Sequence, residues 1–285
     1  TWRVQVLKTS PGSLANSALA RAQRKDIGET ATWVLDGNGP RILFVHGFRG
    51  DHHGLMAIAG AMPEAQIVVP DLPGYGKTEA FAQEHNLDNY GRWLKEFVEK
   101  AGPFELVLGH SFGTLVVAAA LSQGLRVKTV LLNPITSRAS EIGGLGQQLA
   151  ERYYRLGHKY PSLLASPIAV RGMSVLLTKT MHFPTRSFIH AQHASFFSNY
   201  REPRVAIEGF RAASNGSVFD YLSGLDGELL LIAGERDIVA PVSKTVELRN
   251  HLPNSQLEVI PKVGHLTHYE TPMQVAKLVE GFVKR

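Results

Sequence analysis

Ser111 lies in residues 109–113, which read Gly-His-Ser-Phe-Gly and could expose a reactive hydroxyl at a sharp turn. The preceding residues 104–108 are strand-like, and residues 114–121 form a strongly apolar, helix-like run. A tight turn from strand to helix forces the serine into a strained backbone conformation, and the flanking glycines remove side chains that would otherwise collide. The start of the helix also offers free backbone N–H groups to a developing oxyanion. This context predicts that Ser111 is a catalytic nucleophile.

Such a serine needs a histidine base and a carboxylate that orients the histidine, because a hydroxyl is a poor nucleophile at neutral pH. The chain has 12 histidines, and His265 stands in a short Val-Gly-His loop after the strand-like residues 256–260. Asp237 ends a Gly-Glu-Arg-Asp loop that leaves the carboxyl end of the apolar run 229–233. If the chain order is serine, acid, histidine, Asp237 and His265 are the expected partners of Ser111.

The segments that must position these residues alternate between short, β-branched, apolar runs and longer helix-like runs. This alternation is typical of an α/β fold with a mainly parallel sheet and helices on both faces. Eight segments are predicted as strands: residues 3–8, 31–36, 41–45, 66–70, 104–109, 129–133, 228–233 and 256–260. Helices are predicted over residues 89–101, 112–123 and 272–284, the second of them stopping at Gly124.

About ninety residues between the sixth and seventh predicted strands contain no clear buried strand, which is too many for an ordinary loop. Within them, residues 145–154, 174–180 and 202–213 are predicted as short helices. These helices are separated by prolines, namely Pro161, Pro167, Pro184 and Pro203. We therefore predict one core domain, built from residues 1–134 and 227–285, with residues 135–226 inserted as a helical cap.

The composition limits the function further. The 285 residues are 44% hydrophobic and 19% charged, as in an ordinary globular protein. The net charge is +5, but Lys and Arg are scattered, so we expect no nucleic-acid partner. The absence of cysteine excludes disulfides, thiolate catalysis and cysteine-ligated zinc. Neither a leader sequence nor a membrane-length apolar run is found, which favours a cytoplasmic enzyme with a small-molecule substrate and no membrane partner. The oligomeric state is left open.

With their flanking elements, Ser111, Asp237 and His265 resemble the α/β-hydrolase superfamily over roughly the whole chain apart from the cap. The order and spacing of the three residues match the family closely. The resemblance implies the α/β-hydrolase fold, with Ser111 as nucleophile, His265 as general base and then general acid, and Asp237 as the orienting carboxylate. No metal or organic cofactor is needed.

Two further loops carry the resemblance. Residues 45–50, Val-His-Gly-Phe-Arg-Gly, resemble the family's oxyanion loop, which implies that the backbone N–H groups of Phe48 and Phe112 form the oxyanion hole. His46 is interpreted as a structural hydrogen-bonding residue rather than a catalyst. Residues 71–78, Asp-Leu-Pro-Gly-Tyr-Gly-Lys-Thr, resemble a structural loop of the family. They do not fit a phosphate loop, because the second glycine comes too early.

The acid and the base each have rivals. Glu235 could replace Asp237, but the family's acid usually follows the glycine of this loop by three positions, which favours Asp237. His268 could replace His265, but the glycine before His265 matches the family pattern, so His268 is interpreted as a surface or rim residue. Some family members carry the acid where this chain has Asn133, an alternative that we disfavour.

Three histidines, His182, His190 and His193, cluster in the predicted cap together with several phenylalanines. Their spacing matches no zinc-binding helix, so we expect them to pack the cap or line its pocket and to bind no metal.

The expected reaction is acyl transfer in two steps, in which Ser111 attacks a small, apolar ester or thioester and water then releases the acid. The aspartate-dependent dehalogenase and epoxide-hydrolase branches are disfavoured, because a serine stands at the nucleophile position. Carbon–carbon bond hydrolysis, lactone opening, cofactor-free peroxidase activity and ligand binding without catalysis remain alternatives.

Overall fold

The computed structural model describes residues 10–142, 152–157, 159–160, 163 and 166–285. An eight-stranded sheet in the order β1-β2-β4-β3-β5-β6-β7-β8 forms its centre. Its strands are β1 (Gln23–Arg24), β2 (Thr32–Leu35), β3 (Arg41–Val45), β4 (Gln66–Pro70), β5 (Leu106–His110), β6 (Lys128–Leu132), β7 (Leu229–Gly234) and β8 (Ser255–Ile260). Only the pairs β1–β2 and β2–β4 are antiparallel, so the predicted, mostly parallel sheet is confirmed.

The first edge strand differs from the prediction. Residues 3–8 lie outside the described residues, and the eighth strand is instead β1, which pairs Gln23 with Val34 and Arg24 with Trp33. Both residues of β1 are exposed and polar. An edge strand of two polar residues carries no hydrophobic alternation, so the sequence pattern could not reveal it.

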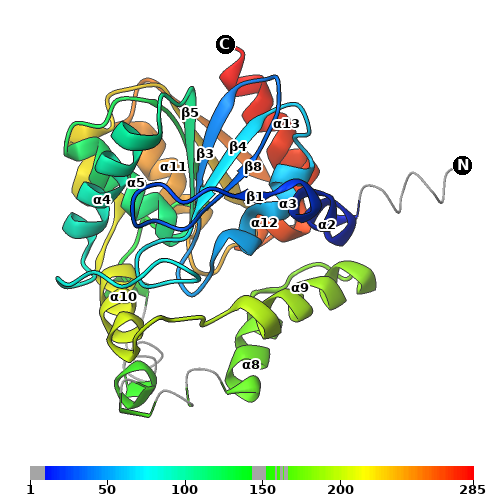
Figure 1. The fold of residues 1–285 in the computed structure, drawn as a ribbon, viewed down its shortest axis with the longest axis vertical. Coiled ribbons are helices and arrows are strands. Elements are labelled where there is room, and N and C mark those ends of the chain that lie inside the picture. The colour runs from blue at the N-terminus through cyan, green and yellow to red at the C-terminus, as the bar shows by residue number, and fades with distance from the viewer. Residues whose placement is uncertain (1–9, 143–151, 158, 161–162, 164–165) are drawn as a thin grey trace, which may run out of the picture.

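Helices cover both faces of the sheet, as predicted (Figure 1). One layer contains α4 (Leu87–Ala101), α5 (Phe112–Ser122) and α11 (Val242–His251), and the other contains α2 (Pro11–Arg21), α3 (Met56–Gly60), α12 (Thr267–Glu270) and α13 (Pro272–Val283). Successive side chains of β3 alternate between the two resulting cores: Leu43 packs with the α4 and α5 side, and Ile42 and Phe44 pack with the α3 and α13 side. The sheet is thus buried on both faces, which holds the ends of its strands rigid.

The described residues between β6 and β7 are helical or irregular. They form α6 (Ala139–Ile142), α8 (Pro167–Leu177), α9 (Phe183–Phe196), α10 (Pro203–Asn215) and the 3₁₀ helix η3 (Val218–Gly224). The predicted helix over residues 145–154 falls mostly outside the described residues. The predicted helix over 202–213 corresponds to α10, whereas the one over 174–180 overlaps only the last turn of α8. Pro167, Pro184 and Pro203 lie in the first turns of α8, α9 and α10, where proline is favoured, so each of them marks the boundary between one helix and the next, as predicted.

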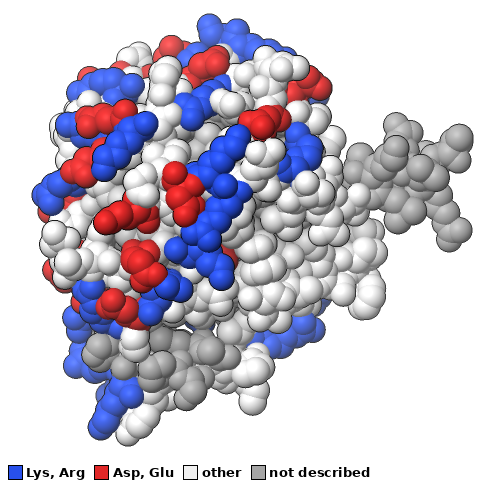
Figure 2. Space-filling view, viewed as in Figure 1, with Lys and Arg blue, Asp and Glu red and all other residues white. Residues whose placement is uncertain are grey.

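In Figure 1, α8 and α9 lie side by side beyond one end of the strands, and α10 lies apart from them at the same end. Charged side chains are spread over the upper and left part of the face in Figure 2, whereas its lower right part is largely uncharged. Exposed apolar side chains of the inserted segment include Ile168, Met181 and Phe183.

Within the described part of the chain, no helix has both the length and the apolar character of a membrane span. The division into residues 1–134, 135–226 and 227–285 stays a prediction.

Candidate active site

Ser111 occupies the turn between β5 and α5 in a backbone conformation, φ 53° and ψ −120°, that side-chain-bearing residues rarely adopt. Both flanking glycines are required by close backbone contacts. A Cβ on Gly109 would lie 2.5 Å from the Gly113 oxygen, and a Cβ on Gly113 would lie 2.3 Å from the Val45 oxygen. The packing of α5 against β3 and β5 therefore holds the strained serine in place.

The structure brings Ser111, Asp237 and His265 together at the carboxyl edge of the sheet, after β5, β7 and β8 respectively. His265 Nε2 lies 2.7 Å from Ser111 Oγ, and His265 Nδ1 lies 2.8 Å from Asp237 Oδ2. These are hydrogen-bonding distances. The arrangement allows the imidazole to accept the serine proton while Nδ1–H donates to the carboxylate.

Asp237 is buried, and its two oxygens have separate partners. Oδ1 accepts hydrogen bonds from the backbone N–H groups of Val239 and Ala240, at 2.8 and 2.9 Å, whereas Oδ2 faces His265. Burial by itself would raise the pKa of Asp237, but the adjacent His265 and the two backbone donors outweigh it and hold the pKa below its usual value. The carboxylate therefore stays charged at neutral pH.

Asn133, which follows β6, has a role that the sequence did not reveal. Its side-chain amide donates to Asp237 Oδ2 at 2.8 Å, and its oxygen accepts a hydrogen bond from the Thr267 hydroxyl. Asn133 thus supports the carboxylate rather than replacing it. The one sequence feature that could have indicated this contact is the position of Asn133, where some members of the family carry the acid itself.

Glu235 and His268, the alternatives to Asp237 and His265, do not take the places of the acid and the base. Glu235 is exposed and accepts a hydrogen bond from the backbone N–H of Lys262 at 2.7 Å. His268 is 5% exposed, so its interpretation as a surface or rim residue was wrong. It packs against His110 at a ring-centroid distance of 4.0 Å.

The loop after β3 places Phe48 beside Phe112, the first residue of α5, with their ring centroids 6.2 Å apart. The N–H of a first helical residue has no acceptor within its own helix. His46 fixes this loop, because its Nδ1–H donates to the Gly47 oxygen and its Nε2 accepts from the Leu72 N–H, both at 2.9 Å. Burial lowers the pKa of His46, which keeps it neutral in this structural role.

Arg49 continues the same loop and connects it to the inserted helices. It has a positive φ of 65° and is 2% exposed. Its Nε donates to Ser198 Oγ at 2.9 Å and one terminal nitrogen donates to the Tyr154 hydroxyl at 3.0 Å, while its carbonyl oxygen accepts from the Ser198 N–H at 2.8 Å. The loop that carries Phe48 is therefore braced by residues that lie more than a hundred positions away.

A cavity of about 330 Å³ opens beside Ser111. The core contributes Phe48, Phe112, His265 and Leu266 to its wall. The inserted segment contributes Tyr154, Met173, Leu177, His193, Phe197 and Phe210. Most of these side chains are apolar, as expected for a pocket that takes up the carbon chain of a substrate.

The loop of residues 71–78 is structural in its contacts. Asp71 accepts hydrogen bonds from the backbone N–H groups of His52 and Lys77, each at 2.8 Å. Gly76 has a φ of 54°, and a Cβ there would lie 2.1 Å from an Asp71 oxygen. The loop thus wraps around the Asp71 carboxylate and offers no open phosphate cradle.

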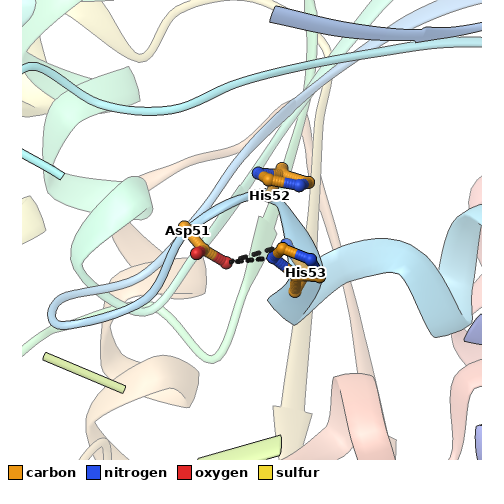
Figure 3. A group of neighbouring side chains, drawn as sticks. All are labelled: Asp51, His52 and His53. Carbon is orange, nitrogen blue, oxygen red and sulfur yellow. Dashed lines mark hydrogen bonds and ion pairs between the residues drawn. The ribbon is translucent and has the colours of Figure 1, made fainter. Parts of the chain in front are cut away.

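Asp51, His52 and His53 are the one group of three or more His, Asp or Glu residues, among those that the structure describes, whose potential ligand atoms lie within 4.8 Å of one another (Figure 3). Asp51 accepts a hydrogen bond from the His53 N–H at 3.0 Å, and its Oδ1 lies 2.9 Å from His53 Nδ1. The two imidazoles are tilted against each other with their centroids 3.9 Å apart. Trp33 stacks on His52 at 3.4 Å, and Phe196 of α9 stacks on His53 at 3.6 Å. His52 Nδ1 also lies 2.9 Å from Asp71 Oδ1, so the Nδ1 atoms of both rings face carboxylates, and the ring contact with Phe196 packs α9 on the core.

The three histidines of the inserted segment have separate surroundings. His182 Nδ1 lies 2.9 Å from the Thr185 hydroxyl, and His190 Nδ1 lies 2.6 Å from the Ser174 hydroxyl, which connects α9 to α8. His193 alone of the three lines the cavity.

Comparison with known proteins places the chain in a family. The model of the alpha/beta hydrolase family matches residues 42–278, and the chain therefore belongs to that family and is a hydrolase. Monoacylglycerol lipase ABHD6 from Mus musculus is 24% identical to it, over 87% of this chain and 76% of the lipase. A 2-hydroxymuconate semialdehyde hydrolase from Pseudomonas putida is also 24% identical, over 87% of this chain and 88% of that protein.

A similar fold occurs in the esterase EaEST from Exiguobacterium antarcticum, with a TM-score of 0.74 and 18% sequence identity. The match covers 90% of this chain and 96% of the esterase. At this identity the likeness concerns the fold, which agrees with the α/β-hydrolase fold expected from the sequence.

Proposed function

We propose that the protein hydrolyses a small, apolar carboxylic ester or thioester through an acyl-enzyme on Ser111. One observation carries the proposal. Ser111 Oγ, His265 and Asp237 form a continuous series of two hydrogen bonds, 2.7 and 2.8 Å long, and this series lies beside an apolar cavity. A relative named as a monoacylglycerol lipase supports an ester as the substrate.

In the first step, Ser111 Oγ attacks the carbonyl carbon and its proton passes to His265 Nε2. The carbonyl oxygen becomes an oxyanion, which the backbone N–H groups of Phe48 and Phe112 stabilise. The tetrahedral intermediate then collapses as His265 returns the proton to the departing alcohol or thiol, and the acyl group stays on Ser111.

In the second step, His265 takes a proton from water, and the resulting hydroxide attacks the acyl-enzyme. Collapse of the second intermediate releases the carboxylic acid and returns the proton to Ser111. Asp237 stays ionised throughout, holding Nδ1–H of His265 and stabilising the imidazolium.

A second candidate is hydrolysis of a carbon–carbon bond in a diketone-like substrate. A relative named as a 2-hydroxymuconate semialdehyde hydrolase favours it, because the named substrate carries no ester. The same three residues would serve this reaction, so the two candidates differ in the substrate rather than in the machinery.

A chain-length series of p-nitrophenyl esters and acyl thioesters tests the proposal. We expect turnover that rises with chain length and falls once the acyl chain exceeds the cavity, together with loss of turnover in Ser111→Ala. Absence of turnover on the whole series, with cleavage of a vinylogous diketone that depends on Ser111, would replace ester hydrolysis by carbon–carbon hydrolysis.

A further inference from the structure

Helix α8 has apolar side chains on its outer side as well as on the side that faces the protein. Val170 and Leu177 are buried, whereas Ile168, Val175 and Leu176 are 86%, 48% and 56% exposed. Val175 and Leu176 follow Ile168 by seven and eight positions, which places all three on one face of the helix. A helix that is apolar on all sides is normally covered by protein or lipid, so the outer side of α8 requires a partner.

The turn from α8 to α9 continues this apolar surface. Met181 and Phe183 lie in the turn and are 84% and 79% exposed. The hydrogen-bonding contact between Ser174 and His190 joins the two helices, and the largely uncharged lower right part of Figure 2 overlies them. An exposed apolar patch of this kind marks an interaction site. We call it the apolar cap surface, and its members are Ile168, Val175, Leu176, Met181 and Phe183.

Cationic side chains border the apolar cap surface. Lys179 Nζ donates to the Leu176 carbonyl oxygen at 3.1 Å, and a terminal nitrogen of Arg186 lies 3.7 Å from the Met181 sulfur. Arg171 is exposed on α8 itself. Positive charges therefore stand directly beside the exposed apolar side chains.

The surrounding sequence supplies no negative charge to balance these cations. Residues 152–201 contain seven Lys and Arg and no Asp or Glu, although the whole chain has 25 Asp and Glu residues. Glu270 of α12 faces the segment from the core, but its carboxylate accepts hydrogen bonds from the backbone N–H groups of Lys179 and Thr180, at 2.6 and 3.1 Å. The outer surface of α8 and the turn after it is thus both apolar and positively charged.

We propose that the apolar cap surface docks on the face of an anionic phospholipid membrane. Its apolar side chains would enter the interface, while Arg171, Lys179 and Arg186 would contact the lipid headgroups. Met173 and Leu177 of the same helix line the cavity beside Ser111, so docking would bring the cavity wall to the lipid. The inference goes beyond the proposed function and does not depend on it. The expectation of no membrane partner concerned spanning and leader segments, and an interfacial contact needs neither.

The shape and the charge of the surface favour lipid over protein. A protein partner would need grooves that fit the projecting Met181 and Phe183, whereas a lipid interface adapts to them. A second copy of the chain, bound through the same surface, would bring identical residues face to face. Arg171, Lys179 and Arg186 of the two copies would then repel one another.

Cosedimentation with lipid vesicles tests the docking surface. We expect native protein to bind vesicles of equimolar phosphatidylcholine and phosphatidylglycerol at least about tenfold more tightly than vesicles of phosphatidylcholine alone. Raising the salt from about 0.1 M to 1 M should remove most of this difference, because the Debye length falls from about 10 to 3 Å.

The apolar contribution is tested with the double variant Met181→Ser and Phe183→Ser, which should weaken binding by about tenfold. The matched control is Val246→Ser with Met273→Ser, because these residues of α11 and α13 are also partly exposed, at 42% and 47%. It should bind like the native protein.

The charge contribution is tested by replacing Arg171, Lys179 and Arg186 together with glutamine. This triple variant should bind about 100-fold more weakly, because each cation near an anionic surface contributes about 1 kcal/mol. The control replaces Lys100, Lys277 and Lys284, which are exposed in α4, in α13 and directly after α13. It loses the same net charge and should keep most of the binding.

Absence of binding to the anionic vesicles at low salt would overturn the proposal, and so would equal losses in the two charge variants or native binding by the Met181 and Phe183 variant. A dimer in sedimentation velocity that this variant dissociates would assign the surface to a second copy instead. Binding to soluble polyglutamate as tight as to vesicles, and lost in both cap variants, would assign it to an acidic protein. None of these measurements involves hydrolysis, so the proposed function can fail separately.

Discussion

Asp237→Asn is expected to lower kcat by about 10⁴-fold while the fold stays intact. Two backbone N–H groups, from Val239 and Ala240, point at Oδ1 and require an acceptor there. The new amide must therefore keep its oxygen on that side and turn its NH₂ group toward His265. His265 Nδ1 then has to accept a hydrogen bond, which places its proton on Nε2.

A proton on Nε2 faces Ser111 Oγ, 2.7 Å away, and the imidazole can no longer accept the serine proton. The NH₂ group of the variant also meets the side-chain NH₂ group of Asn133, which donates to Oδ2 in the native protein. This second conflict should cost some stability. The loss should appear in kcat rather than in substrate binding.

Steady-state kinetics on the best ester of the chain-length series measure the effect, with circular dichroism to show that the variant is folded. Glu235→Gln is the matched control, since Glu235 lies in the same loop and contacts Lys262 instead of His265. It should retain activity within about threefold of the native value. Near-native turnover in Asp237→Asn, with a large loss in Glu235→Gln, would assign the role of the acid to Glu235.

Gly113→Ala should destabilise the protein by about 3 kcal/mol or more, because the new methyl group would enter a space already filled by backbone. Its Cβ would lie 2.3 Å from the Val45 oxygen and 2.8 Å from the His46 oxygen. Neither β3 nor the loop after it can give way without moving Phe48. Activity should therefore fall even in molecules that remain folded.

Thermal unfolding measures this effect, and we expect the melting temperature to fall by roughly 6–12 °C. Gly281→Ala is the control, because Gly281 is exposed in α13 and a Cβ there meets nothing within 4 Å. That change should stabilise the helix by about 0.5–1 kcal/mol. Equal melting temperatures for the two variants would contradict the proposed tight packing of α5 on β3.

The strands beside the active site could be predicted because β3, β5, β6 and β7 are short, nearly continuous apolar runs. The loops after β5, β7 and β8 then narrowed the search to Ser111, Asp237 and His265. Helix α9 was missed because its moderate hydrophobicity is interrupted by histidines and polar residues.

Other parts of the site depend on contacts that local patterns do not encode. Asn133 and Thr267 meet across more than a hundred residues to support Asp237. Arg49 donates hydrogen bonds to Tyr154 and Ser198 in the inserted segment, and these contacts hold the loop that carries Phe48. Sequence pattern identifies residues that must be at the ends of strands, whereas these partners become visible only when the chain is folded.

Labelling with a fluorophosphonate probe tests the central claim most directly, because the probe phosphonylates only a serine that a base activates and an oxyanion hole supports. The native protein should incorporate one probe molecule, and mass analysis of its peptides should place the adduct on Ser111. Ser111→Ala should not be labelled, and Asp237→Asn should be labelled far more slowly. No labelling of native protein, or equal labelling of Ser111→Ala, would contradict the assignment of Ser111 as the nucleophile.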